Sequence, residues 1–307
     1  MSSAEIIVLV GPTASGKSSL AMRLAPAFGA AIVSADSMQI YRGMDIGTAK
    51  PTIEERARVP HHLIDVADPD EHFHAGRYQK EADRAIAALR ASGKVPFVVG
   101  GTGLWVKALL HGLFADTTLP QAGKWRDPAR RRPLTKDDPH ATLRRLDPEA
   151  GRRIHPSDTV RTLRALDVLL RTGRSITELQ EHHGFRENRY QALLIGLSPP
   201  RDELRRRIET RVDRMMEQGL LEEVRALLLR GYEPTLPSMR ALGYRHMAKV
   251  LRGSEDLAAA AEEMKRDTKR YAKRQLTWFR HQEHVIWFEA GDDARIPERI
   301  QRALEEV

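Results

Sequence analysis

The sequence contains no cysteine among its 307 residues. This absence excludes disulfide frameworks, thiolate nucleophiles, cysteine-ligated zinc and iron–sulfur clusters. Long apolar runs are also missing, because no window approaches the roughly 18 apolar residues that span a bilayer. The amino terminus has no positively charged region before its short apolar run, Ile6–Val10, so we expect no secretory signal. These absences predict a cytoplasmic protein with no membrane partner.

The composition indicates a folded globular protein, with 41% apolar and 30% charged residues. The length predicts about two domains. The net charge is +8, and residues 121–190 carry much of the excess, with 16 basic and 10 acidic side chains. A concentration of positive charge fits a polyanionic partner such as nucleic acid. A solvated arginine-rich helix face explains the charge alone equally well.

Short apolar runs alternate with helical patterns in the first third of the chain, an order that favours a parallel sheet. We expect strands at 6–10, 31–34 and 95–99 and helices at 17–28 and 76–91. From 114 to about 139 the pattern dissolves into proline, aspartate, threonine and arginine, which indicates a boundary. Residues 140–183 are helical in pattern, and strand-like runs return at 190–197 and 285–288. The run at 190–197 predicts that the sheet domain resumes there, after a helical insertion.

The segment between the first strand and the first helix, GPTASGKS, satisfies the phosphate-loop pattern G-x-x-x-x-G-K-[ST] in the required context. Its backbone N–H groups can surround phosphate oxygens at a helix amino terminus. Lys17 adds a point charge, and the Ser18 hydroxyl can be a ligand of a Mg²⁺ cofactor. We expect a diphosphate or triphosphate, ATP included, to bind Gly11, Pro12, Thr13, Ala14, Ser15, Gly16, Lys17 and Ser18. The predicted fold is therefore α/β, a P-loop NTPase-like parallel sheet flanked by helices.

The phosphate loop alone does not reveal the reaction. The third strand runs into Gly100–Gly103, where an ATPase or kinase would normally carry a metal-binding aspartate. Asp36 follows the second strand, and the parallel-sheet rule places it at the carboxyl edge beside the phosphate loop. From position alone, Asp36 could be a general base, a magnesium ligand or a cap of the next segment.

Taken together, the motifs resemble those of the bacterial tRNA dimethylallyltransferases, also called tRNA isopentenyltransferases. The resemblance covers nearly the whole chain, and several of the motifs are unusual. They are GPTASGKS at 11–18, SADSMQIYRGMDIGTAKPT at 34–52, PHHLID at 60–65, VVGGTGLWVKALL at 98–110, RRIHPSD and RALDVLLRTGRS within 146–175, MRALGY at 239–244 and YAKRQLTWFR at 271–280.

The resemblance implies transfer of a dimethylallyl group from dimethylallyl diphosphate to N6 of adenosine 37, beside the anticodon, in tRNAs that read codons beginning with U. Diphosphate is then a leaving group, so no aspartate is needed after the third strand. Asp36 matches the catalytic aspartate of the family and is expected to act as general base. Thr102 and Arg240 match residues that stabilise the leaving diphosphate, together with Lys17 and Mg²⁺.

The family also implies a tRNA site, because the adenine must leave its stack to react. Residues expected to contact the tRNA anticodon stem-loop are Asp36, Ser37, Met38, Gln39, Thr102, Arg131, Val160, Arg161, Thr162, Leu163 and Arg164. The family usually has glutamine where this chain has Val160, which puts a base-reading hydrogen bond there in doubt. The predicted domains are a P-loop core, 1–113 with 189–307, and a helical, tRNA-contacting insertion, 114–188. We expect a monomer.

The segment 265–274 combines basic residues at helical spacing with three nearby aromatic residues, Tyr271, Trp278 and Phe279. We interpret the basic face as binding the tRNA backbone and the aromatic residues as packing. Three alternatives stay open: a small-molecule kinase, a non-catalytic RNA-binding protein, and a prenyltransferase that acts on free adenosine phosphate. The basic insertion and the YAKRQLTWFR segment favour tRNA over the last.

Overall fold

The computed structural model describes residues 3–113, 138–184, 187–282, 284–289 and 294–305. By its internal contacts the chain divides into two compact units, Met1–Leu110 with Asn188–Val307, and His111–Glu187. No helix in the described part of the chain is long and apolar enough to cross a membrane.

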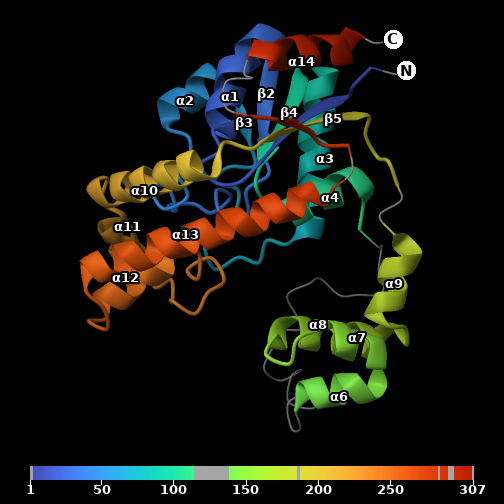
Figure 1. The fold of residues 1–307 in the computed structure, drawn as a ribbon, viewed down its shortest axis with the longest axis vertical. Helices are drawn as coiled ribbons and strands as arrows, with labels where there is room; N and C mark the ends of the chain where they lie inside the picture. The colour runs from blue at the N-terminus through green and yellow to red at the C-terminus, as the bar shows by residue number, and fades with distance from the viewer. Residues whose placement is uncertain (1–2, 114–137, 185–186, 283, 290–293, 306–307) are drawn as a thin grey trace. The chain divides into compact units, whose positions relative to one another are not determined.

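The first unit is built on a six-stranded sheet in the order β3-β2-β4-β1-β5-β6, in which every neighbouring pair is parallel (Figure 1). The strands are β1 (Ile6–Val10), β2 (Ala30–Ser34), β3 (His61–His62), β4 (Val95–Gly100), β5 (Ala192–Leu197) and β6 (Ile286–Phe288). All five residues of β1 and of β2 are buried, as expected for a parallel sheet covered on both faces. The α/β prediction is confirmed, including the return of the chain to the sheet after the helical segment.

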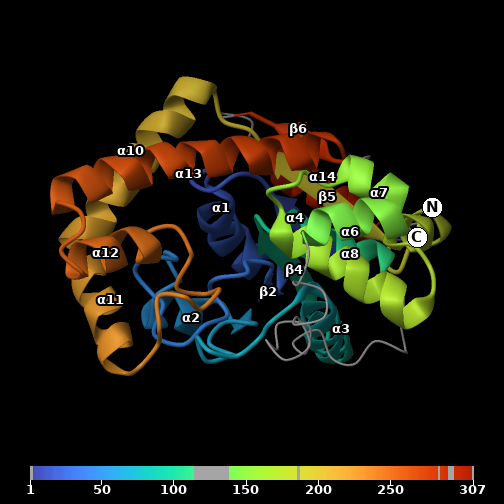
Figure 2. The ribbon, with the colours of Figure 1, turned by 90° about the horizontal axis from the view of Figure 1, so that it is seen from below.

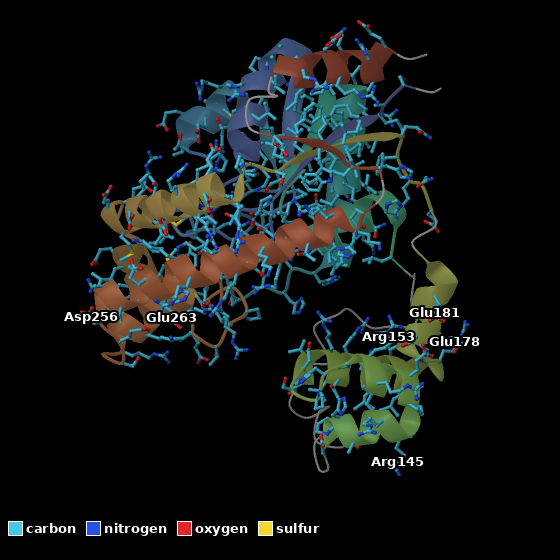
Figure 3. The ribbon with its side chains drawn as sticks, in the orientation of Figure 1. Arg145, Arg153, Glu178, Glu181, Asp256 and Glu263 are labelled. Carbon is cyan, nitrogen blue, oxygen red and sulfur yellow. The ribbon has the colours of Figure 1, made fainter. Side chains whose placement is uncertain are left out.

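Helices surround this sheet and continue beyond it. They are α1 (Lys17–Leu24), α2 (Ile53–Arg58), α3 (Ala75–Ala91), α4 (Gly103–His111), α10 (Arg201–Glu217), α11 (Leu220–Leu229), α12 (Tyr244–Leu251), α13 (Leu257–Arg280) and α14 (Arg295–Glu305). The long α13 has α12 near its first residues and α4 near its last ones, in both views (Figure 2). Figure 3 labels Asp256 and Glu263 near the first of these ends.

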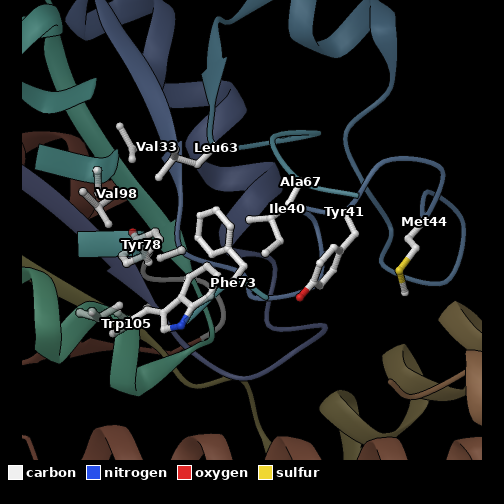
Figure 4. Close-up of a cluster of buried hydrophobic side chains, with 14 of the residues drawn as sticks. Val33, Ile40, Tyr41, Met44, Leu63, Ala67, Phe73, Tyr78, Val98 and Trp105 are labelled. Atoms are coloured by element: carbon white, nitrogen blue, oxygen red, sulfur yellow. The ribbon is translucent and has the colours of Figure 1, made fainter. Parts of the chain in front are cut away.

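Apolar side chains of several elements pack beneath the carboxyl ends of the strands (Figure 4). Tyr78 of α3 stacks on Trp105 of α4, with ring centroids 4.4 Å apart. Phe73 packs against the same Trp105 ring, with centroids 5.5 Å apart. Aromatic pairs of this kind add to the stability that burial provides. The cluster gives the loops above it a rigid base.

The second unit is helical, with α6 (Pro139–Leu146), α7 (Pro148–Arg153), α8 (Thr159–Thr172) and α9 (Ile176–His183). Its small core contains Leu143, Ala150, Ala165 and Leu166. Asp147 caps the first turn of α7 by accepting from the Ala150 N–H, and its other oxygen accepts from the Ser175 hydroxyl. Figure 3 shows Arg145 projecting from α6.

Candidate active site

The phosphate loop begins directly after β1 and ends in α1. Gly11 has φ +151°, and a Cβ there would lie 2.8 Å from the carbonyl oxygen of Leu197. Gly16 has φ +94°, in the left-handed region that favours glycine. The Ser15 Oγ is buried without a hydrogen-bond partner among the described residues. The loop therefore has the backbone shape of a phosphate cradle and an internal hydroxyl that an anion oxygen could satisfy.

A cavity of about 1370 Å³ opens against this loop. The Lys17 and Ser18 side chains line it from α1, and Arg207 and Arg211 line it from α10. Arg207 donates to the Ser15 carbonyl oxygen at 3.3 Å, so α10 contacts the phosphate loop directly. Cationic side chains thus surround the site from two elements that are far apart in the sequence.

Burial lowers the pKa of Lys17 to about 8, although the nearby carboxylate of Asp36 favours the charged form. Burial also lowers the pKa of Arg211, and Asp36 again acts in the opposite direction. Asp36 is thus close enough to interact electrostatically with both cations. Sequence reasoning missed Arg211, because it lies in an arginine-rich helix whose pattern resembles a solvated face.

The loop after β2 is joined to the glycine-rich loop after β4. The Thr102 hydroxyl accepts from the Ser37 N–H at 3.0 Å and lies 3.3 Å from the Ser37 Oγ. The Thr102 N–H donates to the Ala35 carbonyl oxygen at 3.2 Å. One oxygen of Asp36 accepts from the Met38 N–H at 2.9 Å. The structure therefore brings Asp36, Ser37 and Thr102 together, as the sequence predicted for residues at one sheet edge.

Gln39 holds this loop in place. Its amide donates to the carbonyl oxygens of Thr48 and Ala49, each at 3.3 Å, and its oxygen accepts from the Ser34 hydroxyl at 3.2 Å. Arg211 donates to the same Thr48 carbonyl at 3.2 Å. The amide group of Gln39, a residue expected to contact tRNA, thus contacts the protein in this structure.

A second glutamine, which the sequence analysis did not single out, joins the phosphate loop to the glycine-rich loop. The Gln275 Oε1 accepts from the Thr13 N–H at 2.8 Å, and its Nε2 donates to the Gly101 carbonyl oxygen at 2.9 Å. Gln275 lies on α13 and is 7% exposed. Its position within the YAKRQLTWFR motif was the available signal.

Arg240 lies in the segment between α11 and α12, where its side chain is exposed. Its backbone N–H donates to the Leu236 carbonyl oxygen. Within the described residues its guanidinium makes no ion pair. The charge is thus available to a ligand, and the structure records no contact with Asp36 or Thr102.

The expected tRNA-contacting stretch of the helical unit opens α8. The side chain of Arg161 is 78% exposed and lies 3.2 Å from Asp158, while Val160 is 55% exposed. Thr162 and Leu163 are buried, at 1% and 5% exposure. Arg164 pairs with Asp167 at 3.4 Å. Arg131 lies outside the described residues.

The basic face expected on α13 is partly neutralised. Lys265 pairs with Asp213 at 2.8 Å, and Lys269 pairs with Glu209. Both acids belong to α10, so these two lysines join helices. Trp278 is 40% exposed but packs closely against Gly103, and Phe279 is buried, as predicted for packing residues.

One group of possible metal ligands occurs among the described residues. His246, Glu263 and Asp267 place ligand atoms within 4.8 Å of one another. Asp267 is already paired with Arg245, and Glu263 with Lys249 at 2.7 Å. The protein's own cations neutralise these carboxylates, so the group is an internal ion-pair network that joins α12 to α13.

Comparisons with known proteins agree with the motifs. A family model described as IPP transferase matches residues 39–282, and one described as isopentenyl transferase matches residues 4–67. A tRNA dimethylallyltransferase of Syntrophobacter fumaroxidans is 49% identical over 97% of this chain and 87% of that protein. One of Geobacter sulfurreducens is 48% identical over 94% and 93%.

Solved structures agree as well. The full-length tRNA isopentenylpyrophosphate transferase of Bacillus halodurans is 38% identical, with a TM-score of 0.73 over 98% of this chain and 97% of that one. A eukaryotic dimethylallyltransferase acting on tRNA is 26% identical, with a TM-score of 0.77 over 96% and 77%. The similarity therefore covers sequence and fold along almost the entire chain.

Proposed function

Since the chain belongs to the tRNA dimethylallyltransferase family, we propose that it acts on N6 of adenosine 37, beside the anticodon, in tRNAs that read codons beginning with U. The donor is dimethylallyl diphosphate, which binds at the phosphate loop. The observation that carries the proposal is the joining of two loops. One has the backbone shape of a phosphate cradle and the other bears Asp36, and Gln275 and Thr102 connect them through the glycine-rich loop.

The reaction forms a bond between adenosine N6 and C1 of the dimethylallyl group while the bond from C1 to the diphosphate oxygen breaks. The N6 proton passes to Asp36, and diphosphate leaves with the bonding electron pair. Asp36 suits this role because one carboxylate oxygen is held by the Met38 N–H. Its other oxygen makes no hydrogen bond to a described residue and can accept the proton.

The leaving diphosphate gains negative charge, so cations around it lower the barrier. Lys17 and Arg211 line the cavity against the phosphate loop, and Arg240 offers an exposed guanidinium. Thr102 orients the Ser37 backbone beside the reacting groups. The Ser18 hydroxyl also faces the cavity, and such an oxygen is the donor type that Mg²⁺ prefers. When bound by Ser18 and diphosphate, Mg²⁺ would neutralise charge on the departing oxygens.

The helical unit contributes to tRNA binding in this proposal. Arg161 and Val160 are exposed near the start of α8, and Arg161 can contact a backbone phosphate. Thr162 and Leu163 are buried, so any RNA contact from them would use backbone atoms. We also propose that the enzyme works in the cytoplasm as a monomer.

The proposal is tested by incubating the protein with radiolabelled dimethylallyl diphosphate, Mg²⁺ and unmodified tRNA that carries adenosines 36 to 38. Nucleoside analysis should find label in N6-dimethylallyladenosine at position 37. ATP hydrolysis is measured in parallel without RNA. Consumption of ATP with no labelled nucleoside would support a kinase instead. Label in free adenosine phosphate rather than in tRNA would show that the acceptor is not the proposed one.

A further inference from the structure

The side chain of Gln275 bridges two backbone groups, and only a side chain with both a donor and an acceptor can do so. The Thr13 N–H needs an acceptor, and the Gly101 carbonyl needs a donor. A primary amide supplies both from one planar group. At 7% exposure the bridge has little access to water, so a side chain without these atoms would leave two backbone groups unsatisfied.

The surrounding packing makes the bridge short and stiff. A Cβ on Gly101 would lie 2.2 Å from the Gln275 Nε2, and one on Gly103 would lie 2.0 Å from the Trp278 Nε1. Residues 101 and 103 must therefore be glycine for α13 to approach this closely. The residue between them, Thr102, is thus held from both sides by α13.

The bridge connects the loop that would hold the diphosphate donor to the loop that supports the acceptor site. On one side, Thr13 belongs to the loop that would hold the leaving diphosphate. On the other side, Gly101 precedes Thr102, whose hydroxyl binds the backbone of Ser37, next to Asp36. Thr13 and Gln275 are 262 positions apart in the chain, so α13 supplies a connection that neither loop can make locally.

We propose that Gln275 is a positioning residue, which fixes the distance between the leaving diphosphate and the amine that Asp36 deprotonates. Both hydrogen bonds of its amide go to backbone groups of the protein. This inference rests on the proposed transfer reaction. Reactions of this type depend steeply on alignment, because a misplacement of about 1 Å can cost about 100-fold in rate.

The test compares single-turnover rates at saturating substrates in the wild type, in Gln275→Met and in Gln282→Met. The first variant keeps length and neutrality but removes both hydrogen bonds. Gln282 lies just beyond α13, and its side-chain amide donates to the Trp278 carbonyl oxygen at 3.3 Å, so its variant is a matched control. Rates are normalised to the fraction of active sites, and the Kd of dimethylallyl diphosphate is measured separately.

We expect Gln275→Met to lower the single-turnover rate about 30-fold, with less than a threefold change in Kd and with normal rates in the control. A wild-type rate in Gln275→Met would overturn the inference. So would a loss explained entirely by fewer active sites or by weaker diphosphate binding. If the wild type itself transfers no dimethylallyl group, the proposed function fails. If the wild type and Gln275→Met both transfer it at the normal rate, only the inference about Gln275 fails.

A second variant, Gln275→Glu, gives a readout that a purely structural role would not move. A protonated carboxyl group has a donor and an acceptor, as the amide does, whereas a carboxylate only accepts. Burial raises the pKa of such a carboxyl group. The rate of Gln275→Glu relative to wild type should therefore rise as pH falls from 8 to 6, because the protonated fraction of the carboxyl group increases. A ratio that does not change with pH would contradict the bridge.

Discussion

The pKa of Lys17 predicts how the binding of diphosphate changes with pH. Burial lowers this pKa to about 8 in the free protein, which puts its titration within an accessible range. A bound diphosphate favours the charged amine, so the pKa of Lys17 is higher in the complex. The affinity for diphosphate is therefore highest below pH about 8 and falls as pH rises through that value.

The size of the effect follows from the same pKa. At pH 7.5 most Lys17 side chains are charged, and at pH 9 about ten in eleven are neutral. The Kd of dimethylallyl diphosphate should thus increase about eightfold from pH 7.5 to pH 9, provided that the pKa in the complex stays above this range. Ionisation of the ligand adds little, because the second pKa of a phosphate monoester is about 6.

Isothermal titration calorimetry with dimethylallyl diphosphate and Mg²⁺, in the absence of tRNA, measures this Kd. Lys17→Arg is the control, since its guanidinium stays charged throughout the range. Its Kd should differ from wild type but vary less than twofold with pH. Equal wild-type Kd values at pH 7.5 and 9 would refute the reasoning, and so would an eightfold pH effect that persists in Lys17→Arg.

Three further predictions concern the base, the glycine-rich loop and the RNA contact. Asp36→Asn keeps the acceptor for the Met38 N–H but should lower single-turnover transfer about 10²- to 10⁴-fold with unchanged tRNA affinity; an unaltered rate would exclude the base role. Gly100→Ala places a Cβ 2.1 Å from the Ala35 carbonyl oxygen and should cost about 3 kcal/mol or more of unfolding free energy in urea. Gly93→Ala, which has nothing within 4 Å, should cost about 1 kcal/mol because of its positive φ; equal losses would contradict the packing argument. Arg161→Ala should reduce the slope of log K against log salt for tRNA binding by about one, and an identical slope would count against that phosphate contact.

Local patterns predicted the framework of the site well. The run Ile6–Val10 became β1 with the predicted bounds, and the phosphate loop follows it because strand, glycines and helix lie within one short segment. The rule for parallel sheets predicted that Asp36 lies at the carboxyl edge of the sheet, whereas Thr102 was expected in the site only from the family resemblance. These successes share a physical cause, since each depends on neighbouring residues or on the shared direction of adjacent strands.

Contacts between distant segments could not be predicted in this way. The two-residue β3 is too short for a periodic signal, and its strand character comes from pairing with β2. Gln275 looked like one polar residue in a basic helix, and its bridge to Thr13 depends on how α13 crosses the sheet edge. A side chain whose role is to satisfy two backbone groups far away leaves no local pattern in the sequence.

The charges of α10 and α13 show that part of the basic face expected on α13 is neutralised by acids of a distant segment. On one face of α10, Glu209 and Asp213 neutralise lysines of α13, and these pairs hold the two helices together. On another face, Arg207 and Arg211 line the cavity at the phosphate loop. The acids and bases of α10 nearly balance in number, and Arg207 itself pairs with Glu203 of the same helix. Arg211, by contrast, makes no ion pair with a described residue and lines the cavity. A helix of almost no net charge therefore places the guanidinium of Arg211 against an anionic substrate, and the ion pairs of Lys265 and Lys269 hold α10 against α13.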